Sequence, residues 1–528
     1  MTSSLILYSI LTLLLFSALS PAAFLFRRSL AFSWLTALVG ALVGWGLILF
    51  VGFNLPLSIP LLTWKPNEFF PISPALLVDQ YSWPFALALA TIALAMILTD
   101  VAREFEVELS SWAASLAIIA VGLVAVLAGN PLTLLLGWAA LDITELLILL
   151  RRLHRMDEYR QAIAVFAARA GGMFIFLYGL VQASPQNIQL RFDQIPSNAS
   201  IYLLLAASLR LGVVPLHAPF WDEPPIRRGI GTVSRLSTAA ASLVLLPRVA
   251  SIGIQESQAT ILLILTGLAA LYAGFSWFNA AEELEGRPFW ILGMAALSLI
   301  AAIRSLPLAS LAWGITLIFS GGLLFLFSAR NRFLLFLPII SVLSAAALPF
   351  TSSWYTTQIY TRPLSLWYLA PIFSHALLLG GFIRHSLRSG EELSRVERWV
   401  WLIYPGGLFM ILLSQYLAGW LSGILLGGKG WAIGFATLLP ATFVIGLALL
   451  WLLWARHGRR MPEWVGVFFR NVFSLIWFYN LLGWLFRLIG RAISFLTIVL
   501  EGEGGVLWAL LLLVLLIAFL SHRGLAGG

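Results

Sequence analysis

The sequence has no cysteine and very little charge. Without a thiol the chain can form no disulfide, no thiolate zinc site and no protein-ligated iron–sulfur cluster, and it has no cysteine nucleophile. Lysine is almost missing as well, since only Lys65 and Lys429 occur, both between apolar runs. Charged residues make up 10% of the 528 residues, against about 25% in an ordinary soluble domain. These absences argue against a soluble catalytic domain.

The residues that are present are mostly apolar, at 60% of the chain. A bilayer core needs roughly 20 apolar residues per helix, and the chain has room for many such segments. The pattern predicts an all-α polytopic membrane protein of about sixteen transmembrane helices. The apolar runs fall at 4–26, 30–52, 82–100, 111–128, 131–150, 161–182, 200–216, 230–250, 258–278, 289–305, 306–326, 333–349, 363–383, 399–425, 430–455 and 505–521.

Arginines concentrate in alternate loops, from Arg27 and Arg28 to Arg459 and Arg460. By the positive-inside rule these loops are cytoplasmic. The net charge of +9 is explained in this way, and no nucleic-acid partner is expected. The segment 1–26 has no basic residue before its apolar run, unlike a secretory signal. We interpret it as a retained first helix with its N-terminus outside, in a multi-pass protein of the cell (inner or plasma) membrane.

Residues 465–500 fit no ordinary span. The segment is apolar and aromatic, but Asn480, Arg487 and Arg491 recur at helical spacing on one face. This pattern predicts an amphipathic lateral helix along the membrane surface or against neighbouring helices. The alternative is a tilted seventeenth span.

Two apolar runs end in a proline followed by aromatic residues. Pro215 ends the seventh run and Pro349 ends the twelfth, five helices later. Proline frees a carbonyl and interrupts a helix, and paired interruptions in two halves are typical of transporters built from inverted repeats. We therefore predict two broken helices in inverted repeats, with chance recurrence of proline as the alternative.

Several motifs in this order resemble the antiporter-like membrane subunits of complex I (NADH:quinone oxidoreductase) and of Mrp-type sodium/proton antiporters. Leu77–Ser82 is similar to the family's L-V-D-x-L-S, Arg210–Trp221 to K-S-A-x-x-P-L-H-x-W-L-P, and Leu348–Trp354 to L-P-P-F-x-G-F-W. Weaker similarities start at Asn130, Phe166 and Gly231. The chain is a divergent member by these motifs, because each matches only in part.

The resemblance implies a membrane subunit of a multi-subunit complex that contributes to proton or sodium translocation. Its partners would be other membrane subunits, the lipid bilayer and H⁺ or Na⁺. It would carry no cofactor, no metal and no redox chemistry of its own, and would be at most the ion-translocating part of an enzyme. The implied organisation is N-terminal helices at 1–100, an antiporter-like core of two inverted five-helix units at 101–383, further helices at 384–464, the lateral helix at 465–500 and a final span at 501–528.

The resemblance also implies a row of buried charged residues, and here that row is altered. The fifth-helix glutamate position is Ala139, the seventh-helix lysine is Arg210, the eighth-helix histidine is Thr238 and the twelfth-helix lysine is replaced by Thr356. Intramembrane charges are costly and mark function by default. The ion-translocation candidates are therefore Asp142, Glu145, Arg169, Arg210, His217 and His375.

Each candidate has a structural alternative. Asp142 and Glu145 could only neutralise Arg169 or Arg210, and His217 could be a hydrogen-bond partner at the helix break. His375 is the preferred proton relay because histidine titrates near neutral pH, but it could instead be bonded to a backbone carbonyl. Arginine stays protonated, so the loss of lysine keeps open a non-conducting structural subunit. A stand-alone secondary transporter is the other alternative.

Overall fold

The protein is described by a computed structural model. It describes residues 4–456 apart from 62–72, 103–108, 154–155, 184–190, 218–227, 330–332, 350, 361–368, 389, 391–397 and 426–437. It also describes single positions between 480 and 494, and residues 503–524.

The chain divides into two units, Met1–Pro462 and Glu463–Gly528. The larger unit is built almost wholly of helices, as the apolar runs predict. Its α-helices are α1 (Ser4–Arg27), α2 (Leu30–Val51), α3 (Ser82–Asp100), α4 (Leu109–Val126), α5 (Pro131–Arg152), α6 (Met156–Ala183), α7 (Ser197–Arg210), α8 (Arg228–Leu243), α9 (Leu245–Ile252), α10 (Glu256–Asn279), α11 (Glu283–Ile303), α12 (Pro307–Leu326), α13 (Phe336–Ala345), α14 (Leu369–Ser386), α15 (Val400–Leu425) and α16 (Leu438–Arg456).

Short elements complete the larger unit. The 3-10 helices are η1 (Gly52–Asn54), η2 (Phe192–Gln194) and η3 (Trp354–Tyr360). The strands β1 (Leu57–Pro60) and β2 (Ala75–Val78) form an antiparallel pair. This pair is a small departure from the all-α prediction. The sequence did not indicate it, because each strand has only four residues.

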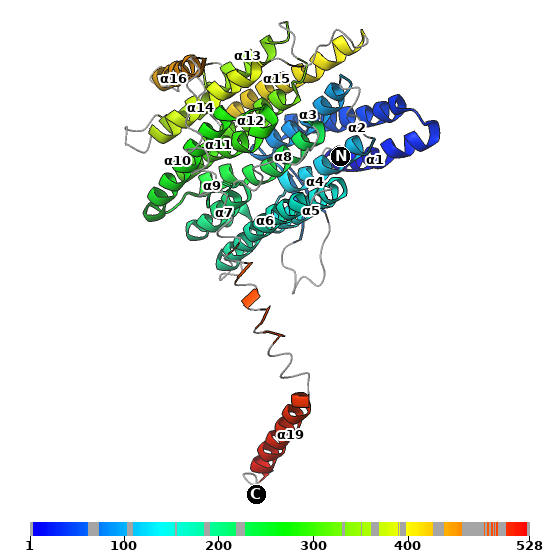
Figure 1. Cartoon of the computed structure of the whole chain (residues 1–528), viewed down its shortest axis with the longest axis vertical. Helices are drawn as coiled ribbons and strands as arrows, with labels where there is room; N and C mark the ends of the chain where they lie inside the picture. The colour runs from blue at the N-terminus through cyan, green and yellow to red at the C-terminus, as the bar shows by residue number, and fades with distance from the viewer. Residues whose placement is uncertain are drawn as a thin grey trace. The chain divides into compact units, whose positions relative to one another are not determined.

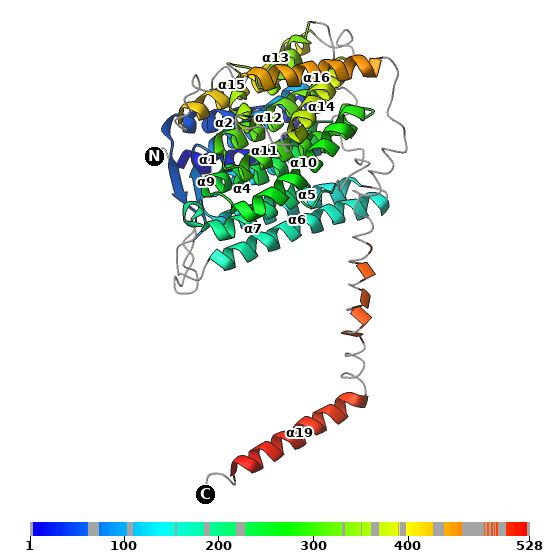
Figure 2. The same cartoon turned by 90° about the vertical axis from the view of Figure 1, so that its left-hand side faces the viewer.

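Helices α8, α11 and α12 lie in the middle of the larger unit. In both views α5, α6 and α7 lie along one side of it, and α13, α15 and α16 lie along the opposite side (Figure 1 and Figure 2). The α8–α9 segment and α12 are almost completely buried inside the unit, whereas α1 and α6 are largely uncovered. Apolar faces such as that of α6 would contact lipid in a bilayer, while polar side chains on α8 are enclosed by protein.

Ten helices in the described residues are long and apolar enough to cross a membrane, with four shorter apolar helices besides. The chain is therefore a multi-pass membrane protein. The number of sixteen spans stays a prediction, and so does the orientation of the N-terminus. Of the predicted lateral helix, 465–479 and 495–500 lie outside the described residues, and the described positions from Asn480 onward are helical. The segment predicted as a final span contains the helix α19 (Glu503–Gly524) of the smaller unit. Its crossing of the membrane and the lateral helix stay predictions.

Helices α7 and α13 both end a few residues before the prolines at which broken helices are predicted, so proline does not itself end either helix. The two broken helices stay a prediction. Helix α7 ends at Arg210, where Gly212 adopts φ +78° and donates to Leu209 O while Val213 donates to Ser208 O. This is a Schellman ending, which requires a left-handed residue. A Cβ at Gly212 would also lie 2.6 Å from His217 O.

Helix α13 ends in a related way at Ala345. Ala347 adopts φ +58° and donates to Ser344 O, two residues before Pro349. Because alanine has a side chain, this left-handed conformation is strained at Ala347. The glycine at the end of α7 avoids that strain. The inverted symmetry of the two halves stays a prediction.

A third interruption was not predicted. The apolar run 230–250 divides at Val244 into α8 and α9. Pro247 has no N–H for the carbonyl of Leu243, so one helical hydrogen bond is missing there. Proline inside a hydrophobic run carries this signal in the sequence.

Candidate functional site

Two carboxylates project from one buried face of α5. The helix begins at Pro131 with Asn130 as its cap, whose Oδ1 accepts from the backbone N–H of Thr133 at 2.8 Å. From that start, Asp142 and Glu145 are three residues apart and therefore lie one turn from each other on the same face. Each is only 2% exposed. Ala139, at the family's glutamate position, cannot supply a charge.

Asp142 forms a two-pronged ion pair with Arg210 at the end of α7. Arg210 Nη1 donates to Oδ2 at 2.6 Å and Nη2 donates to Oδ1 at 3.0 Å. Its Nε donates to Ser242 Oγ at 3.2 Å, and the guanidinium lies 4.3 Å from the ring centre of Trp138. Both side chains of the pair are 1% exposed. The geometry uses the fixed fork of arginine, which lysine does not have.

Glu145 pairs with two other arginines. Arg169 of α6 donates to Oε2, and Arg235 of α8 approaches Oε1 at 3.3 Å, where Ser234 also donates. Arg169 Nη1 lies 3.7 Å from Asp142 Oδ1 as well. Arg169 therefore connects the two carboxylates, and four helices meet in one network of buried charge.

Small residues make room for this network. Gly172 of α6 faces Arg210, and a Cβ there would lie 2.7 Å from Arg210 Cγ and 3.0 Å from Ala206 O. Any larger residue at 172 would push the arginine or the α7 backbone away. The absence of a side chain at this position is therefore needed for the placement of Arg210 opposite Asp142.

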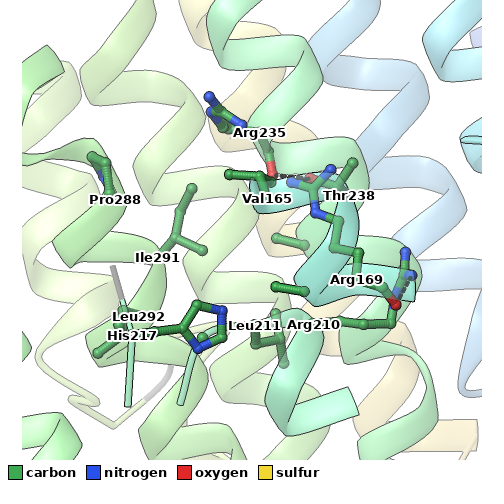
Figure 3. Close-up of a pocket in the computed structure, with 13 residues that line it drawn as sticks. Val165, Arg169, Arg210, Leu211, His217, Arg235, Thr238, Pro288, Ile291 and Leu292 are labelled. Atoms are coloured by element: carbon green, nitrogen blue, oxygen red, sulfur yellow. Dashed lines mark hydrogen bonds between the residues drawn. The ribbon is translucent and has the colours of Figure 1, made fainter. Parts of the chain in front are cut away.

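A cavity lies beside the network, with about 70 Å³ of space for the centres of water molecules. A buried water needs only about 10–15 Å³ of such space, so several fit. The cavity is lined by Arg169, Arg210, Arg235, Thr238 and His217 and by apolar residues of α6, α8 and α11. Figure 3 shows Arg169, Arg210 and Thr238 toward one side of it and His217 with Pro288 and Ile291 toward the other.

His217 is where the sequence placed it, at the break after α7. The ring is 3% exposed and its Nδ1 lies 2.9 Å from the carbonyl oxygen of Pro215. A nitrogen facing a carbonyl carries the proton, so His217 has the structural partner that its alternative interpretation requires. It also borders the cavity.

His375 lies outside the network. Its Nε2 is 2.8 Å from Ala345 O at the end of α13, and its Nδ1 is 3.2 Å from Tyr360 Oη at the end of η3. The ring is 1% exposed, and its neighbours are a backbone carbonyl and a phenol rather than carboxylates. The structure thus gives His375 the carbonyl bond of its structural alternative, and nothing described connects it to Asp142 or Glu145.

Arg235 is not among the candidates named from the sequence. It is 6% exposed and bound to Glu145. Ser234 and Thr238 were missed as partners of the network; Thr238 accepts from Arg169 Nη2 at 3.2 Å.

Three solved structures contain chains with this fold. The first is the Mrp complex from Dietzia sp. DQ12-45-1b, with a TM-score of 0.76 and 13% identity over 98% of this chain and 63% of that one. The second is the membrane-bound sulfane sulfur reductase, an archaeal respiratory membrane complex, with a TM-score of 0.67 and 15% identity over 97% and 99%. The third is respiratory complex I from Thermus thermophilus with bound NADH, with a TM-score of 0.58 and 18% identity over 85% and 99%.

These similarities concern the fold alone, and the fold agrees with the family that the motifs indicate. This chain spans 63% of the length of the Mrp chain. No family model matches the sequence, and no curated protein matches it.

Proposed function

We propose that this chain is an antiporter-like membrane subunit of a multi-subunit complex of the complex I or Mrp kind, and that it contributes to the translocation of protons or sodium ions. The orientation proposed from the loop arginines puts its N-terminus outside the cell membrane. Electron transfer, where the complex performs it, belongs to partner subunits.

The observation that carries this proposal is the buried network of Asp142, Glu145, Arg169, Arg210 and Arg235 beside a cavity with room for several water molecules. Burying five charges inside an apolar bundle costs several kcal/mol per ion before pairing offsets it. Replacing such groups by apolar residues is often neutral or stabilising. A network of this size in a membrane helix bundle is therefore better explained by ion movement than by stability.

The carboxylates are the groups that can exchange protons here. The guanidinium groups stay charged at any ordinary pH, so Asp142 and Glu145 would carry the proton or contact the cation. Arg169 contacts both carboxylates, and a shift of this one side chain would favour ionisation of one carboxylate over the other. Water in the adjoining cavity would complete the path.

The second candidate is a non-conducting structural subunit of the same kind of complex. It is favoured by the two-pronged Asp142–Arg210 pair, which fills the position of the family's lysine with a cation that does not release its proton. The two candidates share the fold and the partners and differ only in ion flux.

Two measurements test the proposal. Purification in mild detergent identifies the proteins bound to the chain; we expect membrane subunits of a respiratory or antiporter complex, and recovery of the chain alone would contradict the subunit assignment. The purified assembly is then placed in vesicles with a trapped pH-sensitive dye, and an imposed membrane potential drives ion movement. Flux above that of empty vesicles supports conduction, and its absence supports the structural subunit.

A further inference from the structure

Polar contacts join the facing sides of α8 and α11, away from α5 and its two carboxylates. Arg228, the first residue of α8, donates from Nη2 to Oε1 of Glu283, the first residue of α11, at 2.7 Å. Four residues further along each helix, Arg287 Nη1 donates to Thr232 Oγ1 at 3.2 Å. Because an α-helix makes one turn in about 3.6 residues, the two contacts lie about one turn apart on the same pair of faces. These four side chains form the α8–α11 row.

The same two helices border the cavity further along. The residues that line it from α8 and α11 include Arg235, Thr238, Pro288 and Ile291 (Figure 3). The polar contacts therefore run in step along both helices, from the ion pair at their first residues to the cavity beside the charge network.

The middle of the α8–α11 row is buried deeply for polar groups. Arg287 and Thr232 are both 0% exposed, whereas the side chain of Arg228 at the outer end is 18% exposed. Pro288 has no N–H for the carbonyl of Leu284, so α11 lacks one helical hydrogen bond beside the row. Buried polar groups are costly unless they are hydrogen-bonded, and they hold water where an apolar interface would exclude it.

The outer end of the row lies near further cations, which α14 supplies. Arg384 donates to the carbonyl oxygen of Phe278, and Arg388 donates to that of Ala280 at 3.3 Å, both just before α11 begins. Cations gathered at one end of membrane helices are typical of the cytoplasmic side. The row therefore joins the cavity to an end of the bundle that would face water.

We propose that the facing polar sides of α8 and α11 form a path for water and protons between the cavity and the Arg228–Glu283 end of the bundle, with Thr232 as the hydroxyl in its middle. Arg287 covers Thr232, and a change of its rotamer opens space beside the hydroxyl without moving either helix. Proton transfer along the path rests on the proposed function. Entry of water does not, because it needs only the row and the cavity.

The chain has no cysteine, so a single introduced thiol reports water access at one chosen position. Thr232→Cys and Thr238→Cys place a thiol of similar size in the middle of the path and at the cavity. Thr266→Cys is the matched control, because Thr266 is a fully buried threonine of α10 that does not line the cavity. The purified assembly is exposed to silver ions, which are small, charged and bind thiolates, in chloride-free nitrate buffer. Unreacted thiols are then counted with a maleimide after denaturation.

We expect silver to block Thr232→Cys and Thr238→Cys at least about tenfold faster than Thr266→Cys, whose thiol is reached only by local unfolding. Adding Thr232→Leu to Thr238→Cys fills the path. It should slow the reaction at the cavity by about tenfold or more, because local unfolding is then the remaining route. Thr266→Leu in the same Thr238→Cys protein is the control for added volume. A protein that Thr232→Leu unfolds would react faster, so loss of the fold cannot imitate the expected result.

Three results would overturn the path. They are equal reaction rates for Thr232→Cys and Thr266→Cys, a rate for Thr238→Cys that Thr232→Leu leaves unchanged, and equal slowing by Thr266→Leu. The reaction with silver needs no ion flux. An assembly that reacts as expected but does not conduct would therefore refute the proposed function alone, and a conducting assembly with an unreactive Thr232→Cys would refute the path alone.

Discussion

Replacing Asp142 by asparagine should destabilise the protein strongly, because Arg210 would keep its buried charge and lose its main counter-charge. Arg210 now donates to both carboxylate oxygens, at 2.6 and 3.0 Å. Asparagine would offer it at most one acceptor, which carries no charge. Removal of one partner from a buried ion pair costs about 3–5 kcal/mol. We expect a loss of unfolding free energy near the lower end of this range, since Glu145 remains in the network through Arg169.

The double variant Asp142→Asn with Arg210→Gln separates charge from shape. Removing both charges should recover a large part of the lost stability, because no unpaired ion is left. The control is Asp193→Asn in the exposed Arg191–Asp193 pair, with side chains 63% and 67% exposed, for which we expect a change of no more than about 1 kcal/mol. Thermal unfolding in detergent, monitored as the loss of the monodisperse peak, measures the stability of all three variants. The described energetics of the buried pair would be contradicted if Asp142→Asn had the melting temperature of the wild type. They would also be contradicted if the double variant had a lower melting temperature than the single variant.

Three further predictions follow from particular contacts. Gly172→Leu should displace Arg210 and lower thermal stability as Asp142→Asn does, whereas equal stability would show that α6 and α7 can separate without cost. His375→Phe should destabilise the protein by about 1–3 kcal/mol by leaving the Ala345 carbonyl without its donor, while ion flux per folded protein stays at the wild-type level; lost flux would restore His375 as a relay. Tyr404→Phe removes the acceptor of the Ser328 and Ala329 backbone N–H groups, so its melting temperature should fall by a similar cost, and an unchanged value would mean that water replaces the phenol.

The sequence was sufficient for the helical membrane fold because apolar runs and loop arginines are local signals. It placed α1, α2, α3 and α5 close to their observed bounds. It did not show how α7 ends, since Gly212 five residues before His217 resembles any other glycine in an apolar run. The division at Val244 was missed because a proline one turn later changes only a single hydrogen bond.

The candidate site was found in part for a similar reason. Asp142 and Glu145 are isolated acids in an apolar run, so composition alone marks them, and Arg169 and Arg210 are marked in the same way. Pairing is a property of the packed bundle, however, and the sequence could not tell that Arg235 turns inward to Glu145 while His375 turns to a backbone carbonyl. A row of charges along the chain does not determine which of them share one network.

The most direct test of ion movement through the network is flux through the reconstituted assembly carrying Glu145→Gln. This change keeps the shape of the side chain and removes its proton-exchanging group, and Asp193→Asn serves as the exposed control. We predict that Glu145→Gln abolishes flux driven by an imposed membrane potential while Asp193→Asn retains it. Wild-type flux in a correctly assembled Glu145→Gln protein would contradict the account.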